Sequence, residues 1–418
     1  MGKAAILQNQ TNIRIYNQVR IIELFKEGPK SCSDLAKILN LSNTAVERIV
    51  DELASNNIVE LDKNPEGQNK RGRRPDIYKI NKDFGVVAGV DLSGRDAIIC
   101  ISDLDNNILA RDEVKNVFIY DENIFNEIGE KIKRMLKLDC CEGKKLLNIT
   151  IASPGKINPT DYSYVYAPRI KDYSTTNLHD FYKKMFGVHV YVYNDVNIGL
   201  IGERKYGKSI DNAKNVFFVH IDITAGSALI LNNRLYYGAN GFAGEINSFN
   251  DFDNISTDLN NWRFLTITDV CVETREQANR DPSHPLFNRE QVKFEEVCDL
   301  LESGDPLVTR VVEKIAKYEA LQLLCVNNIL DLDDLVIEGK ILLLGDKFKQ
   351  MIQKYYVEFD NNHNNAKILF SNITGNAIIL GTIYQAINRA FLRQFEKIIV
   401  KKSNDSVFKL DEYFHDSI

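Results

Sequence analysis

The sequence predicts two parts: an N-terminal winged helix-turn-helix that is mainly α, and a larger α/β body with two lobes. Three observations predict this arrangement. Apolar residues near the N-terminus recur at helical spacing, a basic polar segment then separates two short apolar runs, and the rest of the chain alternates β-rich runs with helical patterns. We expect the two parts to span residues 1–82 and 83–418.

The distribution of charge differs between the two parts. Residues 1–82 contain 14 Lys and Arg against 10 Asp and Glu, whereas the remaining residues contain 38 against 48. The net charge of the whole chain is −6, which excludes a uniformly basic nucleic-acid binder. A basic head on an acidic body favours a head that contacts DNA and a body with another task.

Cysteine usage and hydropathy indicate a cytoplasmic protein. The seven cysteines include no pair with Cys-x-x-Cys spacing, so neither a disulfide framework nor a zinc cluster is expected. The N-terminus lacks the pattern of a signal peptide, and no apolar run reaches 18 residues. We therefore expect no membrane association.

Three helices are expected in the head. The first has an apolar face with three- and four-residue spacing, made of Ile15, Val19, Ile22 and Phe25. A Gly-Pro pair ends it. A second helix at 34–39 is capped by Ser31 or Ser33, and a third begins after Ser42 and runs to about Ser55.

The second and third helices are typical of a helix-turn-helix, whose second helix enters the major groove of DNA. Apolar residues of the third helix point inward and leave its polar N-terminal end facing out. We predict DNA contacts from side chains that can reach base edges or phosphates, namely Ser42, Asn43, Thr44 and Arg48.

A hairpin with a long basic tip follows these helices. Strands expected at 58–61 and 76–80 enclose a polar segment, as in a wing. Four cations at its tip suit phosphates or the minor groove, namely Lys70, Arg71, Arg73 and Arg74. The alternative is a plain helical bundle with a solvated basic loop, but the order of the two motifs favours DNA recognition.

Strands and helices alternate in the body, which predicts a two-lobed α/β protein. Helices are expected at 124–136 and 196–206, and strands at 85–90, 97–104, 108–114, 147–152, 188–193, 216–221, 228–231, 334–337 and 367–370.

The order of several body motifs resembles the ROK family of repressors and sugar kinases. The motifs are Gly89 to Arg95, Ser153-Pro154-Gly155, Asn194 to Asn197, Gly238 to Ile246, Asn327 to Gly339, and Gly375 with Gly381. The head and its wing look like the repressor branch of transcriptional regulators. The resemblance implies the actin-like, ribonuclease-H-like ATPase fold of sugar kinases for the body.

The resemblance also implies a sugar site made of Gly155, Asn194, Asp195 and Glu245. Asparagine and carboxylate groups match the vicinal hydroxyls of a polyol. In a kinase Asp195 would act as the general base on the sugar hydroxyl, whereas in a repressor it would only accept a hydrogen bond. On the residues alone, Asn194-Asp195 is also compatible with a turn after a strand.

The segment that resembles the family's second phosphate loop is degraded. Only Gly226 remains of its glycines, Asp222 would repel a polyphosphate, and Ile223 and Ala225 add side chains where backbone should approach. Arg95 replaces a threonine of the first loop and is compatible with either loss or gain of a phosphate contact. We therefore expect weak or absent nucleotide binding, no enzymatic activity and no cofactor.

The zinc motif of many family members is missing. Asn247-Ser248 stand where the resemblance implies glycine and histidine, and residues 249–276 contain a single cysteine, Cys271. One thiol does not build a tetrahedral site, so no structural metal is expected. Because the lost histidine contacts sugar in the family, the pocket is also compatible with a different ligand or none.

Three functions are compatible with these features. The first is a DNA-binding transcriptional regulator that acts as a repressor of carbohydrate-utilisation genes, with a double-stranded DNA operator, a sugar effector and a homodimeric or tetrameric assembly. The second is an active ATP-dependent sugar kinase with an appended head. The third is a scaffold whose body only dimerises. The degraded phosphate loop favours the first.

Overall fold

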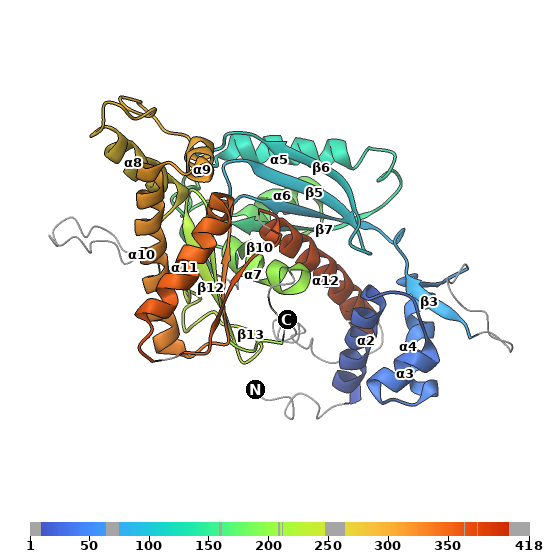
Figure 1. The fold of residues 1–418 in the computed structure, drawn as a ribbon. Helices are drawn as coiled ribbons and strands as arrows, with labels where there is room; N and C mark the ends of the chain where they lie inside the picture. The colour runs from blue at the N-terminus through green and yellow to red at the C-terminus, as the bar shows by residue number, and fades with distance from the viewer. Residues whose placement is uncertain are drawn as a thin grey trace.

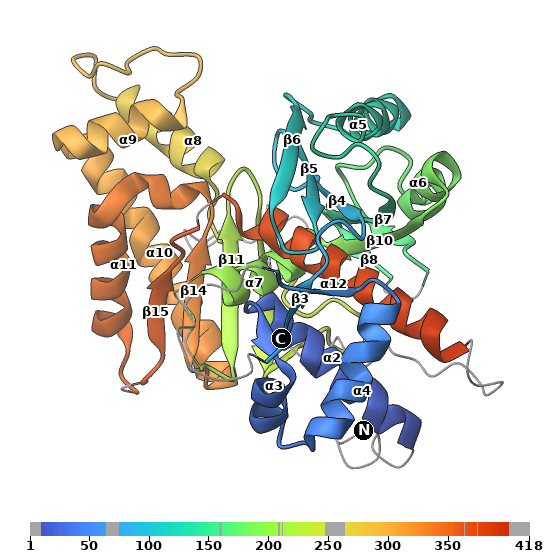
Figure 2. The ribbon, with the colours of Figure 1, turned by 90° about the vertical axis from the view of Figure 1, so that its right-hand side faces the viewer.

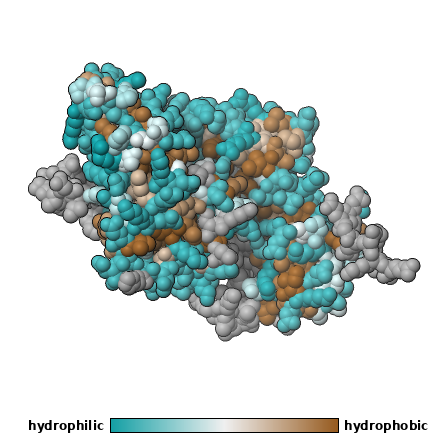
Figure 3. Space-filling view, in the orientation of Figure 1, coloured by the Kyte–Doolittle hydropathy of each residue, from teal (hydrophilic) through white to brown (hydrophobic). Residues whose placement is uncertain are grey.

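The structure is a computed structural model, and it describes residues 10–63, 75–158, 161–207, 210, 212–246, 264–362, 364–373 and 375–400. A small helical head lies beside one end of a larger two-lobed body (Figure 1). In the orientation of Figure 1, the visible face is mainly hydrophilic, with apolar residues in separate patches (Figure 3). Within the described ranges, no helix combines the length and the apolar character needed to cross a bilayer.

Over its described residues, the head contains three helices and a small antiparallel sheet. Ser31 and Ser42 cap the second and third helices, and Asn40 turns the chain between them with a φ of 54°. The sheet has the order β1-β3-β2, so the two wing strands pair directly. The elements are α2 (Gln10–Lys26), β1 (Lys30–Ser31), α3 (Cys32–Leu39), α4 (Asn43–Ser55), β2 (Val59–Leu61) and β3 (Ile77–Ile80).

The first lobe is a mixed five-stranded sheet with the order β10-β7-β4-β5-β6. Its strands are β4 (Val86–Asp91), β5 (Ala97–Asp103), β6 (Ile108–Val114), β7 (Leu146–Ser153) and β10 (His189–Asn194). Two helices pack on one face of this sheet, α5 (Glu122–Met135) and α6 (Leu178–Phe186). A two-stranded hairpin, β8 (Lys156–Ile157) and β9 (Tyr164–Tyr166), follows β7.

The second lobe has a sheet with the order β13-β12-β11-β14-β15. Its strands are β11 (Val216–Ile221), β12 (Ala225–Leu231), β13 (Arg234–Leu235), β14 (Asp334–Glu338) and β15 (Lys367–Phe370). The largest apolar core lies between this sheet and its helices. These are α8 (Ile267–Ala278), α9 (Phe294–Ser303), α10 (Pro306–Leu330), the 3-10 helix η1 (Lys340–Leu344) and α11 (Gly345–Phe359).

Two helices, α7 (Asp195–Tyr206) and α12 (Ala377–Val400), connect the lobes (Figure 2). They touch backbone to backbone, because a Cβ on Gly202 would lie 1.9 Å from the Ala377 carbonyl oxygen and one on Gly381 would lie 2.1 Å from the Ile198 carbonyl oxygen. Only glycine allows so close an approach. Helix α12 also packs on the first-lobe sheet, where the Asn148 side-chain amide donates to the Ala386 carbonyl.

The head shares a core with the body. Val19, Ile22 and Phe25 of α2 are buried in one cluster with Ile383 and Phe391 of α12. Figures 1 and 2 both place α2 beside α12.

Polar contacts reinforce this junction. The Lys26 ammonium pairs with Glu23 at 2.6 Å, bonds to Asn388, and lies over the rings of Tyr384 and Phe391 at 5.2 and 5.6 Å. Head and α12 are therefore joined by both apolar and polar contacts.

Every strand and helix that the sequence predicts is present, most within two residues of the expected ends, and the third head helix ends at Ser55 as expected. Strand β12 begins three residues earlier than predicted, at Ala225. No bounds were predicted for the short strands β8, β9 and β13, nor for the helices α6 and α8 to α12. These two- and three-residue strands are too short to show an alternating pattern.

Candidate functional site

The predicted sugar-site residues Gly155, Asn194 and Asp195 lie together at the carboxyl ends of two neighbouring strands. β7 and β10 are parallel and pair Ser153 with Asn194, so the loops that follow them meet. The Asn194 amide donates to the Gly155 carbonyl at 3.1 Å, and its side-chain oxygen caps α7. Gly155 has a φ of 112°, and a Cβ there would lie 2.6 Å from the Tyr166 carbonyl oxygen.

Asp195 is the first residue of α7 and is buried, with 8% of its surface exposed. Its carboxylate accepts a hydrogen bond from the Val196 amide at 2.9 Å. Burial raises the pKa of Asp195 to about 7, and Asp91 and Glu245 add to the rise while His220 opposes it. The group therefore changes its charge in the physiological pH range.

Glu245 is half-buried and near enough to act on the charge of Asp195. The loop that carries it is held by the Ser227 hydroxyl, which donates to the Gly244 carbonyl at 2.6 Å. The chain thus brings all four predicted sugar-site residues to one region. Asn247 and Ser248, expected to replace a family glycine and histidine, lie outside the described residues.

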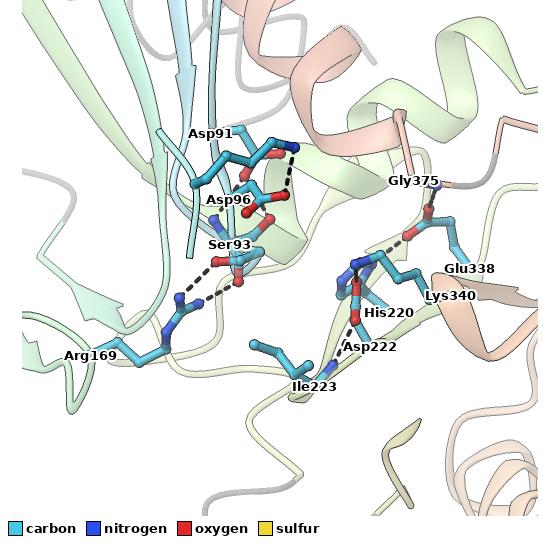
Figure 4. Close-up of polar contacts among 12 residues, drawn as sticks. Asp91, Ser93, Asp96, Arg169, His220, Asp222, Ile223, Glu338, Lys340 and Gly375 are labelled. Carbon is cyan, nitrogen blue, oxygen red and sulfur yellow. Dashed lines mark hydrogen bonds and ion pairs between the residues drawn. The ribbon is translucent and has the colours of Figure 1, made fainter. Parts of the chain in front are cut away.

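Hydrogen bonds within the first phosphate-loop motif and from Arg169 hold that motif in place. Asp91 accepts hydrogen bonds from the amide and the hydroxyl of Ser93, at 2.8 and 2.6 Å. The Arg169 guanidinium donates to the carbonyls of Ser93 and Gly94, at 2.5 and 2.7 Å (Figure 4). Arg95, for which the sequence left two roles open, is exposed and lies 4.2 Å from the centre of the Phe118 ring.

The second phosphate-loop motif is a tight turn between β11 and β12. The Asp222 amide donates to the Thr224 carbonyl, and the Asp222 carboxylate accepts from the Ile223 amide at 2.8 Å. A carboxylate thus binds the backbone amide that a phosphate would need. The Lys340 ammonium lies 3.5 Å from the same carboxylate at the rim.

A buried ion pair lies next to this turn. His220 on β11 pairs through Nδ1 with Glu338 at the end of β14, and Glu338 also accepts from the Gly375 amide at 2.8 Å (Figure 4). We call Asp91, Asp195, His220, Asp222 and Glu338 the central cluster.

The charges of the central cluster determine the protonation state of His220. Burial alone would lower the pKa of His220, but the carboxylates of Glu338, Asp222 and Asp195 outweigh it and raise the pKa to about 9. His220 is therefore a cation among carboxylates. Among the described residues, no group of three or more His, Cys, Asp or Glu side chains is placed to hold a metal ion.

The predicted DNA-contact residues fall into two sets. Ser42, Asn43, Thr44 and Arg48 are exposed on the N-terminal half of α4, whose opposite face is buried. Lys70, Arg71, Arg73 and Arg74 lie outside the described residues.

Sequence reasoning missed both Arg169 and the His220–Glu338 pair. The partners of Arg169 in the first phosphate loop are 75 and 76 positions away, and Glu338 is 118 positions from His220. Both sets of contacts join segments that are far apart in the sequence. A cation between apolar strand residues was the only available signal for His220.

A family comparison matches residues 87–248 to the ROK family. Residues 87–248 form a ROK domain. The matched range contains the first phosphate loop, the sugar-site residues and the turn at Asp222.

Relatives of the chain extend beyond the ROK domain to the head. A xylose repressor from Caldicellulosiruptor bescii is 23% identical over 393 residues, covering 91% of this chain and 97% of the relative. A solved ROK family transcriptional regulator, a homologue of the E. coli MLC protein, has a TM-score of 0.75 at 19% identity, covering 92% of this chain and 98% of that one.

A ROK family glucokinase from Streptomyces griseus, solved with glucose and AMPPNP, has a TM-score of 0.60 at 18% identity. It covers 73% of this chain and is itself covered completely. These likenesses confirm the predicted fold class: a helical head followed by the two-lobed fold of sugar kinases.

Proposed function

We propose that this chain is a transcriptional repressor that binds operator DNA through its head and a sugar between the lobes of its ROK domain. Helix α4 carries the proposal. Its polar N-terminal end is exposed, as a recognition helix requires, while its apolar face is buried in the head. The repressor names of relatives that match the head and body together support it.

The state of the ROK domain supports a sensor without kinase activity. The residues expected to bind sugar lie together, whereas Asp222 occupies the turn expected to bind phosphates. Phosphoryl transfer depends on positioning and on stabilising charge at the phosphates. A carboxylate at this turn opposes both, so we expect sugar binding without turnover.

An active sugar kinase is the second candidate, because Asp195 is buried and its pKa is raised to about 7, which suits a general base. The two candidates differ in a direct assay. ATP consumption that depends on sugar and disappears in Asp195→Asn would establish the kinase.

The test is a gel shift with DNA from upstream of the protein's own gene, repeated with neutral sugars. We expect a specific shift that one sugar releases. Asp195→Asn should keep the shift and lose the release. No specific shift on this or neighbouring promoters would contradict the proposal, and a shift that no ligand changes would favour a scaffold.

The wing is tested by salt dependence. Arg73→Ala with Arg74→Ala should weaken binding to all DNA sequences. It should also reduce the slope of log affinity against log salt concentration by about 2, because each phosphate contact that is lost no longer releases a counterion when DNA binds. Substitution of two exposed body cations, Arg134→Ala with Lys137→Ala, is the matched control. Changes at Asn43 or Thr44 should alter sequence preference more than total affinity. An unchanged slope would exclude the wing from DNA contact.

A further inference from the structure

A pocket lies at the opposite end of the two strands that carry the predicted sugar-site residues. Its volume is about 150 Å³, and it lies between the starts of β7 and β10 and the last described side chains of α12. The lining residues are Lys145, Leu146, Leu147, Gly187, Val188, His189, Ala390, Arg393 and Gln394. His189 and Asn194 are the two ends of β10, so about 17 Å of strand separates this pocket from Asn194.

The polar groups of the pocket are cationic or neutral. Arg393 donates to Nδ1 of His189 at 2.6 Å and to the Tyr191 hydroxyl at 3.4 Å. A guanidinium has five N–H donors, so these two bonds leave three without a partner among the described residues. Lys145 is exposed at the rim.

No acidic group balances these cations within the part of the chain that the structure describes. The lining contains no carboxylate, and neither Arg393 nor Lys145 forms an ion pair with a described residue. Two further cations, Lys183 and Arg389, also act on His189.

Burial and the positive charges around the pocket lower the pKa of His189. Burial lowers its pKa, and Arg393, His179, Lys183 and Arg389 lower it further, to about 3. The imidazole is therefore neutral and accepts the Arg393 hydrogen bond. A dianion in the pocket would compensate these cations and raise the pKa of His189.

We propose that this pocket binds a phosphate group, either as the free ion or as a small phosphate monoester. Arg393 presents unused donors in the planar fork that matches phosphate oxygens, and Lys145 supplies a second positive charge. An engineered cavity of similar size holds benzene, so a phosphoryl group with a short carbon substituent fits the volume.

The pocket lies next to the junction with the head. Phe391 and Leu392, which neighbour the lining residues Ala390 and Arg393 on α12, are buried in the cluster that includes α2. Leu147 of the lining also packs against that cluster. A bound phosphate would therefore act on the helix that holds the head, independently of the sugar site.

Binding is tested by calorimetry on the full chain with orthophosphate, glycerol 3-phosphate and glycerol. We expect saturable binding of glycerol 3-phosphate and none of glycerol. Equal affinity for orthophosphate identifies the free ion as a sufficient ligand, and tighter binding of glycerol 3-phosphate identifies the ester. Failure of both phosphates to bind in the millimolar range would overturn the proposal.

Variants locate the site. Arg393→Gln should weaken binding about tenfold or more, the loss expected for a charge-assisted hydrogen bond, and Lys145→Gln should weaken it severalfold. Arg134→Gln on the exposed surface of α5 is the matched control and should bind as the wild type does. Equal affinity of Lys145→Gln, Arg393→Gln and the control would reject this pocket.

A direct readout does not depend on DNA binding. In an NMR titration of the wild type, saturating glycerol 3-phosphate should raise the pKa of His189 from its low value, whereas glycerol should not. An unchanged pKa of His189 in the presence of saturating glycerol 3-phosphate would place the ligand elsewhere.

Discussion

Single charges decide how the body of this protein behaves. In the central cluster His220 is the only cation among four carboxylates, and all five groups are nearly or fully buried. A carboxylate taken out of water binds protons more readily, whereas a histidine among carboxylates holds its proton. Ligand affinity should therefore depend on pH near neutrality, where Asp195 titrates, and stability should depend on pH in the alkaline range, where His220 titrates.

The affinity for sugar should rise with pH around neutrality. The pKa of Asp195 is raised to about 7, and its ionised form is the better acceptor for a sugar hydroxyl. Between pH 6 and pH 8 we expect an increase of about tenfold in affinity, following the ionised fraction. Calorimetry of the releasing sugar checks this, and Asp195→Asn should remove the dependence. A wild-type affinity that is flat over this range would contradict the role of the carboxylate.

The His220–Glu338 pair should stabilise the fold below about pH 9. The pKa of His220 rises from 6.5 to about 9 on folding, so its contribution is complete below pH 6.5 and is lost as pH rises through 9. The loss is on the order of 3 kcal/mol. Urea unfolding at pH 6.5 and pH 9.5 measures it.

Variants of the same pair provide the control. Glu338→Gln leaves a buried cation without its partner and should destabilise the protein by about 3 kcal/mol at pH 7. The double variant His220→Gln with Glu338→Gln should lose less and show a flatter pH profile. Identical profiles in the wild type and the double variant would show that other groups titrate.

At the scale of elements, the contact between α7 and α12 is the least tolerant of change. Gly202→Ala would force a Cβ against backbone atoms of α12 at 1.9 and 2.8 Å. In most helices this substitution stabilises by up to about 1 kcal/mol, but here the helices must separate, at a cost of about 2 kcal/mol or more. Thermal unfolding measures the difference.

Gly129→Ala in α5 is the matched control. A Cβ there meets the flexible side chain of Met185, whose sulfur atom lies 2.4 Å away, instead of backbone. It should therefore change stability much less than Gly202→Ala. Equal losses of stability in Gly202→Ala and Gly129→Ala would show that the backbone contact between α7 and α12 does not limit the residue at position 202.

Elements with caps and a clear period were predictable, whereas contacts between distant elements were not. Ser42 and the buried face of α4 place that helix within a residue, because both signals are local. The four residues proposed to bind sugar were selected through motifs, each of which is contiguous. Arg169, the His220–Glu338 pair and the contacts of Glu52 with Arg14 and Gln18 depend on tertiary packing and left no local signal.

At the scale of the whole molecule, the proposed sugar site and the head lie at two ends of one series of packed helices. Asp195 begins α7, α7 contacts α12 through Gly202, and Phe391 of α12 packs in the cluster that holds α2. A ligand that binds one arrangement of the lobes better than another would shift this series of helices as a unit. The proposed phosphate pocket meets the same series close to the head.

The head should unfold together with α12. Phe391→Ala removes a buried ring from their common core and should destabilise the protein by about 3 kcal/mol. We expect faster hydrogen exchange throughout α2 as well as in α12. Phe348→Ala, in the core of the second lobe, is the control and should leave α2 protected. Unchanged exchange in α2 after Phe391→Ala would show that the head is stable alone.

The shared core at α12 has an evolutionary consequence. A descendant that lost its head by gene shortening would expose the apolar part of α12 that α2 covers, around Phe391. A continuous apolar strip of this kind promotes aggregation. A return to a free-standing body would therefore require several polar substitutions along α12 before the deletion, which makes the fusion of the two parts difficult to reverse.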